Sequence, residues 1–395
     1  MLGPRLMEEK RLAGWVNVPE DCVRPLARIR LHGSRPPGVN EPTEAGAAGA
    51  AEILRLVASL GPSDLCLCLI SGGGSALMPA PVEGITLADK LAVTRHLSAA
   101  GANIEELNTV RKQLSRIKGD GLARACRAGR LVALVISDVL GDPLDVIASG
   151  PTVRDGSTPE AALAVLDRFR AAEAGIPSRV FERLRRKVRK RGQNSSPSAV
   201  SDNPDAKKSS DPFSCVTNLV IGNNATAVDA AGQEAVRLGY SPAMVSARSS
   251  EGHAEEVGRH LAGTALRMRD EPGPDGLVSG GEPVVKLVEA ARRGLGGRNQ
   301  QLVLAAAEVL WDDGARGLVL LSGGTDGEDG PTDAAGALLD ADVLRAARLR
   351  GLDPRDFLAR NDAYHFFAPL GSLLHTGPTH TNVCDLRVAV VNRAQ

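Results

Sequence analysis

A run of three glycines directly after an apolar segment, within Leu65–Pro79, constrains this chain more than any other stretch. The segment reads LCLCLISGGGSALMP. Its first six residues carry no charge and end in β-branched Ile70, which predicts a strand buried on both faces. The glycines permit positive φ angles and a close approach of the backbone to a ligand. Exposed amides in such a turn bind anions, with help from a helix that follows, although a simple turn of the chain is the alternative.

A second apolar segment, within Leu318–Asp333, ends in the same Ser-Gly-Gly sequence and reads LVLLSGGTDGEDGPTD. Its acids are spaced by glycines and resemble a loop for a divalent ion or a nucleotide, but they lack the EF-hand spacing. A solvated acidic loop is the alternative interpretation. Because two apolar strands end in Ser-Gly-Gly, we favour a functional role over coincidence. The acids are Asp326, Glu328, Asp329 and Asp333.

Helical and strand patterns alternate along the chain, which predicts an α/β protein. A length of 395 residues exceeds the usual size of one domain and predicts two. Residues 191–212 lack strongly apolar side chains apart from Val200, so we expect a disordered insertion at the domain boundary. We expect a Rossmann-like domain over 1–190 and a second α/β domain over 213–395. Both are expected to be α/β/α sandwiches with mainly parallel sheets.

The spacing of apolar residues and the positions of capping residues predict the individual helices and strands. The first 42 residues are irregular, with short strands expected at Gly14–Val18 and Ile29–Leu31. Later strands are predicted at Leu65–Ile70, Leu131–Ile136, Cys215–Ile221, Ala243–Val245, Gly276–Val278, Val284–Leu287, Leu318–Leu321 and Leu386–Val391. Helices are predicted at Thr43–Leu60, Leu87–Ala100, Ile104–Ile117, Thr158–Phe169, Ser178–Lys190, Ala225–Leu238, Glu255–Met268, Ala341–Arg350 and Pro354–Ala359.

Composition and charge exclude several classes of protein. Lys and Arg number 47, as do Asp and Glu, so nothing indicates a nucleic-acid or polyanion partner. No apolar run approaches the ~20 residues that span a bilayer, and the N-terminus lacks the apolar core of a signal peptide. The six cysteines are scattered without a C-x-x-C pair, which favours reduced thiols over a metal site. We therefore expect a cytoplasmic protein.

Asp138 is the first candidate for catalysis. It follows the predicted strand Leu131–Ile136, and open α/β sheets place their chemistry just past the carboxyl ends of central strands. An acid that caps the next helix is the alternative. Arg298 and Asn299 lie in the first turn of a helix expected to open at Gly294, where backbone amides and the helix dipole favour an anion. An arginine is unfavourable for that dipole, so we favour a functional Arg298 over a solvated one.

A basic helix face is predicted within Ile104–Ile117. Arg111 and Ser115 are four residues apart, as are Asn108 and Lys112, so each pair is expected to share a face. A solvated basic face is the ordinary interpretation. Adjacency to the glycine turn makes anion binding an equal alternative.

These residues resemble the class II glycerate kinase family, whose members transfer phosphate from ATP to glycerate. The resemblance covers about residues 14–391 and rests on long motifs in a common order. Some family members are called hydroxypyruvate reductases, so that activity is carried as an alternative. The motifs are LISGGGSAL (69–77), NTVRKQLSRIKG (108–119), SDVLGDPLDVIASGPT (137–152), GGRNQ (296–300), SGGTDGEDGPTDAAG (322–336) and TGPTHTNV (376–383).

The resemblance implies two α/β domains with the active site in the cleft between them, and it implies catalytic roles for Asp138 and Arg298. Phosphoryl transfer depends on positioning and charge neutralisation. We therefore expect Asp138 to act as a base or to orient the glycerate hydroxyl. Arg298 is expected to stabilise charge on the transferring phosphoryl group. The resemblance favours the 2-hydroxyl as acceptor, which gives 2-phosphoglycerate.

The glycine loops and basic residues are expected to bind the remaining groups, with ATP and Mg²⁺ as cofactors. Anionic groups of substrate or nucleotide are expected at Ser71, Gly72, Gly73, Gly74, Ser75, Arg111 and Lys112. Nucleotide is expected at Asn299, Gly323, Gly324, Thr325 and Asp326, and Mg²⁺ at Asp326 and Asp329.

Two departures from the family pattern bear on activity. Family members begin with an additional strand and a Gly-Lys turn whose lysine handles phosphate, whereas Lys10 lies in no such context. The usual His-Pro segment is altered to LHGSRPPGVNEPTEAG (31–46). We expect a truncated N-terminus rather than an inactive variant. The loss of a strand and a helix would expose apolar sheet surface, which a homodimer would cover.

Rival functions lack their own sequence signatures. A hydroxypyruvate reductase would need a dinucleotide fingerprint, and no G-x-G-x-x-G follows a strand with a downstream ribose-binding acid. Serine hydrolysis would need a G-x-S-x-G turn, which is absent from the sequence. A catalytically impaired protein that still binds glycerate or nucleotide is the remaining alternative, and only the missing lysine supports it.

Overall fold

A computed structural model describes residues 12–194, 211 and 213–392 of the chain. The chain forms two compact units, which are described separately below. The first comprises the described residues of Met1–Val135 and Leu144–Leu219, and the second those of Ile136–Pro143 and Val220–Gln395. The segment that carries Asp138 therefore belongs to the second unit, not to an N-terminal domain over 1–190. Most of the expected insertion at 191–212 lies outside the described residues.

The first unit opens with a parallel pair of strands, as expected. β1 (Gly14–Pro19) pairs with β2 (Ile29–Arg35), and α2 (Glu44–Ala58) packs on both. Thr43 caps α2 because its hydroxyl accepts the Gly46 amide at 3.0 Å, which satisfies one of the free amides of the first turn.

A three-stranded sheet follows, with β3 (Leu65–Ile70) at its edge, then β4 (Arg130–Ile136) and β5 (Val216–Gly222). β3 and β4 run parallel. The prediction that β3 is buried on both faces is wrong. Leu65, Leu67 and Leu69 are 61%, 41% and 58% exposed, whereas Ile70 is buried. Side chains alternate in direction along a strand, and only one set of β3 points into the interior of the unit.

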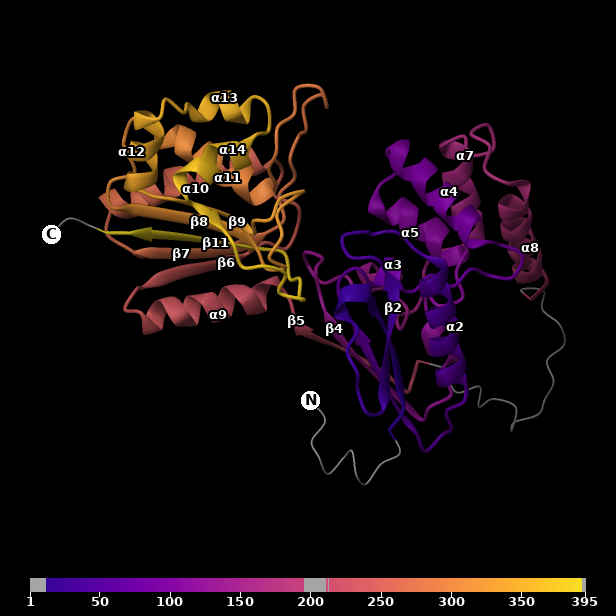
Figure 1. Cartoon of the computed structure of the whole chain (residues 1–395). Helices are drawn as coiled ribbons and strands as arrows, with labels where there is room; N and C mark the ends of the chain where they lie inside the picture. The colour runs from indigo at the N-terminus through magenta and orange to yellow at the C-terminus, as the bar shows by residue number, and fades with distance from the viewer. Residues whose placement is uncertain (1–11, 195–210, 212, 393–395) are drawn as a thin grey trace. The chain divides into compact units, whose positions relative to one another are not determined.

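Helices make up the rest of the first unit (Figure 1). Four of them pack around buried Val93, Leu97 and Val110: α4 (Leu87–Ala99), α5 (Ile104–Gln113), α7 (Pro159–Arg168) and α8 (Ser178–Asn194). Two shorter helices are α3 (Gly74–Leu77) and α6 (Gly121–Ala125).

Helix α5 ends before the predicted Ile117. Ser115 lies beyond it and bridges to Pro81, so Ser115 does not share a helix face with Arg111 as expected. The chain leaves the helix because Arg116 donates its amide to the Ala80 carbonyl at 2.8 Å, outside the helical pattern.

The sheet of the second unit has the order β10-β9-β8-β11-β7-β6. β6 and β7 are parallel, and the other neighbours in this sheet are antiparallel. The α/β class is confirmed, and the expected parallel pairing holds for β1–β2, β3–β4 and β6–β7. The C-terminal sheet is mixed because the last strand inserts antiparallel between β7 and β8. The strands are β6 (Pro242–Ser246), β7 (Gly276–Gly281), β8 (Leu318–Gly324), β9 (Gly336–Leu339), β10 (Leu373–Leu374) and β11 (Asp385–Val391).

Helices cover both faces of this sheet (Figure 1). α9 (Asn224–Arg237) packs on β6 and β7, and α10 (Ala254–Asp270) and α11 (Arg298–Val309) lie on the opposite face. Every residue of Asn299–Ala307 in α11 is buried, which explains why its sequence is apolar around most of its circumference. The shorter helices are α12 (Ala341–Leu349), α13 (Pro354–Leu358) and α14 (Ala363–Phe367).

Three local predictions for the second unit need correction. Val284–Leu287 is not a strand and contributes only an isolated bridge between Val284 and His253. α11 begins at Arg298, after the loop that contains Gly294. Gly323 and Gly324 continue β8 and do not form a turn, because β11 pairs with both and β9 pairs with Gly323. In the part of the chain that the structure describes, no helix is long and apolar enough to cross a membrane.

Candidate functional site

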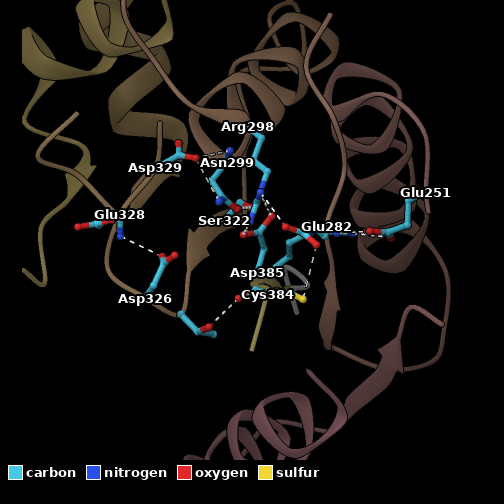
Figure 2. Close-up of polar contacts among 12 residues, drawn as sticks. Glu251, Glu282, Arg298, Asn299, Ser322, Asp326, Glu328, Asp329, Cys384 and Asp385 are labelled. Atoms are coloured by element: carbon cyan, nitrogen blue, oxygen red, sulfur yellow. Dashed lines mark hydrogen bonds and ion pairs between the residues drawn. The ribbon is translucent and has the colours of Figure 1, made fainter. Parts of the chain in front are cut away.

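Arg298 is held at the start of α11 by two carboxylates. Its Nε and Nη2 donate to the two oxygens of Asp385 at 2.7 and 2.9 Å, and its Nη1 lies 3.0 Å from Glu282 Oε1 (Figure 2). The Asp385 side chain is fully buried at the start of β11. This two-pronged contact fixes the plane of the guanidinium group. One nitrogen, Nη1, is left for the more exposed Glu282.

Asp138 and Arg298, predicted from separate motifs, lie close enough to Glu282 and Cys384 for their charges to act on both. The Cys384 thiol, adjacent to Asp385, donates to the main-chain carbonyl of Asp138 at 3.3 Å and lies 3.9 Å from Glu282 Oε2. Figure 2 shows the Cys384 sulfur directed toward Glu282. The structure therefore brings the predicted acid and the predicted arginine together in the second unit.

The cluster is rich in carboxylates, and this changes their proton affinity. Burial raises the pKa of the Asp138 carboxyl above its ordinary value. Burial also raises the pKa of Glu282, partly opposed by the positive charge of Arg298 and reinforced by the charges of Asp385 and Asp138. The single positive charge of the Arg298 guanidinium does not neutralise the negative charges of Asp138, Glu282 and Asp385. The carboxylates of this cluster are therefore suited to accept a proton.

The amides at the start of α11 already bind an anion, and that anion is Asp329. Its carboxylate accepts the Asn299 amide at 3.0 Å and the Gln300 amide at 2.8 Å (Figure 2). Burial raises the pKa of Asp329 to about 6 in spite of these bonds. An external anion is therefore not needed at these amides. Both oxygens of Asp329 accept amides of the helix, which leaves less of the carboxylate for the metal that the sequence suggested.

The predicted nucleotide residues divide into buried and accessible ones. Asn299 is buried, and its side-chain oxygen accepts the Ser322 hydroxyl at 2.6 Å. Thr325 ties its loop to the last strand by donating its hydroxyl to the Cys384 carbonyl at 2.7 Å. Asp326 is half-buried, and one of its oxygens accepts the Glu328 amide at 3.1 Å. Of the two acids expected to bind Mg²⁺, Asp326 keeps an oxygen for a ligand. Among the described residues, no group of three or more acids, histidines and cysteines is arranged to hold a metal.

The glycine turn of the first unit leads directly into Ser75. Gly73 has a φ of +72°, the left-handed conformation that glycine adopts without strain. Ser71 is exposed, and Gly72 and Gly74 are half-buried. The α3 helix that follows has only four residues, which is too short to contribute a strong dipole.

The Ser75 hydroxyl accepts hydrogen bonds from two cations. Arg111 Nη2 and Lys118 Nζ both donate to it, and Lys118 Nζ also donates to the Ser75 carbonyl at 2.8 Å. The Ser75 and Ser149 hydroxyls lie 3.0 Å apart, and Ser149 donates to Asn108 Oδ1 at 3.0 Å. The turn, the basic helix and the 137–152 motif therefore meet at Ser75, as the anion-binding interpretation requires.

Lys112 differs from its neighbour Arg111. Its ammonium lies 3.7 Å from an oxygen of Asp145 and 3.8 Å from an oxygen of Asp155. These two carboxylates compensate its charge. Lys112 therefore has partners within the unit, whereas Arg111 is bonded to a neutral hydroxyl.

Sequence reasoning did not select several residues that complete these clusters. Asp385 directly precedes the last predicted strand, Leu386–Val391. Glu282 follows Ser279-Gly280-Gly281 in the manner of the other glycine loops, which is a signal that was present. Lys90 lies in an ordinary helical pattern and gives no signal of its own. The overlooked residues are Lys90, Lys118, Ser149, Glu282 and Asp385.

Two family descriptions match the chain. A domain of unknown function, DUF4147, matches residues 4–185, and the MOFRL family matches residues 276–385. The first match contains the glycine turn and the Ser75 cluster, and the second contains Arg298 with both of its carboxylate partners. The class of protein is thus one that joins a DUF4147 segment to a MOFRL segment.

Curated relatives with similar sequence identity to this chain indicate its family more specifically. A glycerate kinase of Danio rerio is 40% identical over 87% of this chain and 74% of its own. A D-glycerate 2-kinase of Thermotoga maritima is 40% identical over 86% and 75%, and a putative hydroxypyruvate reductase of Agrobacterium vitis is 40% identical over 93% and 89%. The crystal structure of a glycerate kinase from Thermotoga maritima matches with a TM-score of 0.81 and 36% identity, covering 96% of this chain and 85% of that one. The chain belongs to the glycerate kinase family.

Proposed function

We propose that this protein is an ATP-dependent kinase that phosphorylates D-glycerate at the 2-hydroxyl to give 2-phosphoglycerate. The observation that carries the proposal is the cluster in which Glu282 pairs with a fixed Arg298 and also feels the charge of Asp138, whose own pKa is raised. The names of the relatives support the substrate, and one of them specifies the 2-kinase.

In this mechanism Asp138 accepts the proton of the 2-hydroxyl as that oxygen bonds to the γ-phosphorus of ATP, and the bond from this phosphorus to the bridging oxygen breaks to release ADP. A base whose pKa is raised toward neutrality binds that proton more readily than an ordinary aspartate. Asp385 holds the Arg298 guanidinium in one orientation, so its Nη1 can turn from Glu282 to an oxygen of the transferring phosphoryl group. A cation already in place stabilises the developing charge without reorganisation of the site.

ATP supplies the phosphoryl group and enters as its Mg²⁺ complex. Asp326 is the predicted metal ligand that fits, because within the described residues only its first carboxylate oxygen accepts a hydrogen bond, from the Glu328 amide. Thr325, Gly323 and Gly324 place that loop beside the start of β11, and Asn299 acts from within the core by fixing Ser322. Asp329 organises the start of α11 and is not assigned to the metal.

The 71–75 turn and Arg111 are assigned to an anionic group of substrate or nucleotide. Lys112 is assigned to holding Asp145 and Asp155 in place. Free thiols at Cys66, Cys68, Cys126 and Cys384 support a reducing, cytoplasmic location. The exposed leucines of β3 support a homodimer that covers them.

A coupled assay of ATP consumption with D-glycerate and Mg²⁺, followed by phosphorus NMR of the product, tests the proposal. We expect 2-phosphoglycerate from the wild-type chain and its formation to be at least about 10²-fold slower with Asp138→Asn. A 3-phosphoglycerate product would overturn the assigned acceptor. Reduction of hydroxypyruvate by NAD(P)H without any phosphorylated product would replace the kinase with the reductase. Binding of glycerate or nucleotide without either reaction would identify an impaired homologue.

A further inference from the structure

Two buried lysines and one half-buried arginine of the first unit form a group of cations, and the arginine and one lysine bond to Ser75 of the glycine turn. Lys90, on α4, is 8% exposed, and among the described residues its Nζ has no hydrogen-bond partner. Lys118 is 4% exposed and bonds through its Nζ to two oxygens of Ser75, both of them neutral. Arg111 donates to the same Ser75 hydroxyl. Within the described part of the chain, none of the three forms an ion pair.

The charges of these side chains act on one another. Burial, followed by the charge of Arg111, lowers the pKa of Lys90 to about 7. Burial, followed by the charges of Arg111 and Lys90, holds the pKa of Lys118 well below its ordinary value. An uncompensated buried charge costs several kcal/mol, so a fold retains such a group at a site where a ligand supplies the opposite charge. Lys112 provides the contrast, because it lies on the same helix as Arg111 and has two carboxylate partners.

The residues around Ser75 hold its hydroxyl in a fixed position. Ala148 and Ser149 have φ angles of +50° and +61°, which are costly for residues other than glycine. This conformation lets the Ser149 hydroxyl lie between Ser75 and Asn108, so the hydroxyl that the cations share is itself fixed. A Cβ on Gly73 would lie 3.2 Å from Arg35 Nη2, which places a further guanidinium against the glycines.

We propose that Lys90, Arg111 and Lys118, together with the Ser75 hydroxyl, bind a phosphoryl oxyanion. The assignment of a source for that group, the nucleotide or the phosphoglycerate product, rests on the proposed function. A dianionic phosphate compensates two of the three charges and accepts hydrogen bonds from several directions, whereas a carboxylate compensates one. The proposed site includes a residue outside the motifs identified in the sequence. That residue is Lys90 on α4, whose Nζ supplies the donor without a partner among the described residues.

Titration with inorganic phosphate, followed by thermal unfolding and by isothermal calorimetry, tests the site on the full chain. We expect phosphate to raise the unfolding temperature of the wild type. We expect Lys90→Met to unfold at a higher temperature than the wild type without phosphate, because a buried charge is removed, and to bind phosphate at least about tenfold more weakly. Lys118→Met should also weaken binding. Lys112→Met is the matched control, and its phosphate affinity should change less than about twofold.

Two ligands identify the source. Displacement of phosphate by 2-phosphoglycerate assigns the site to the product, and displacement by a non-hydrolysable ATP analogue assigns it to the nucleotide. Displacement by neither would overturn the proposal, as would an unchanged phosphate affinity in both Lys90→Met and Lys118→Met. These readouts need no turnover. A kinase whose phosphate affinity is insensitive to Lys90 refutes the site alone, and a chain that binds phosphate through Lys90 but phosphorylates nothing refutes the proposed function alone.

Discussion

Arg298 and Asp385 form a two-pronged ion pair across 87 positions of sequence, with donor–acceptor distances of 2.7 and 2.9 Å. The Asp385 side chain has no exposure to solvent. A buried carboxylate depends on its partner, because removal of one member leaves an uncompensated charge. The pair therefore links the stability of the second unit to the position of the proposed catalytic arginine.

Arg298→Met tests that dependence by leaving Asp385 buried and without its cation. We expect the free energy of unfolding to fall by about 3–5 kcal/mol at neutral pH. Arg298→Lys should recover part of that stability but not the activity, because an ammonium cannot reproduce the planar fork. Chemical denaturation and kcat measure the two effects. A stable, active lysine variant would contradict the role assigned to the guanidinium geometry.

Asp138→Asn should reduce kcat about 10²–10⁴-fold, the usual contribution of a general base. Burial raises the pKa of Asp138 and of Glu282, so kcat/KM should fall as the pH drops through a value above the ordinary aspartate range. The folded state then binds the proton more tightly than the unfolded chain, so this group adds stability as the pH falls. Asp138→Asn should remove that increment. Glu282→Gln is the comparison variant. If neither substitution changes the pH profile of kcat/KM, neither group is responsible for the fall in kcat/KM at low pH.

Asp138 and Arg298 of the second unit could be selected from the sequence, whereas Asp385, the partner of Arg298, could not. Asp138 and Arg298 stand at element boundaries within long motifs, which are local signals. Asp385 pairs with Arg298 only because β11 inserts between β7 and β8, and that register is not encoded near either residue. For the same reason the mixed character of the sheet was not predicted. Lys90 was missed because a helical pattern cannot tell a buried lysine from a solvated one.

Asp329→Ala tests whether this acid organises α11. The substitution leaves the amides of Asn299 and Gln300 buried without their acceptor, which should cost about 1–3 kcal/mol of unfolding free energy. Asp329→Asn keeps an acceptor oxygen and should cost less. Denaturant titration gives both values. The Mg²⁺ concentration for half-maximal activity should be unchanged in Asp329→Asn, and a large increase in it would restore Asp329 as a metal ligand.

The two faces of β3 should respond differently to substitution. Ile70→Ala removes a buried side chain and should cost about 2–5 kcal/mol of unfolding free energy. Leu67→Ser changes an exposed side chain and should shift that energy by about 0.5 kcal/mol or less. Thermal unfolding at several protein concentrations checks both. If Leu67→Ser destabilises the protein strongly and the loss depends on concentration, the face is covered by a second copy, in agreement with the proposed homodimer.

The pH dependence of stability should carry the signature of Lys90. Its pKa is about 7 in the folded state and near the ordinary value of 10.5 in the unfolded chain. Between these values the unfolded chain binds more protons, so the stability of the ligand-free protein should rise with pH across this window, and the full cost of the charge is present below it. Arg111 and Lys118 face Lys90 with the same sign of charge, and the nearest acid on its helix, Asp89, is bound by Arg179.

Lys90→Met should flatten this rise and increase stability at pH 7 by on the order of 1–4 kcal/mol. Denaturant unfolding of the wild type and the variant between pH 6 and 10 is the measurement, with Lys112→Met as the control that should retain the rise. Phosphate should have the opposite effect on the wild type, because the bound anion favours the charged lysine and stabilises most at low pH. If the stability of Lys90→Met rises between pH 7 and 10 by the same amount as that of the wild type and of Lys112→Met, Lys90 is not the group that titrates.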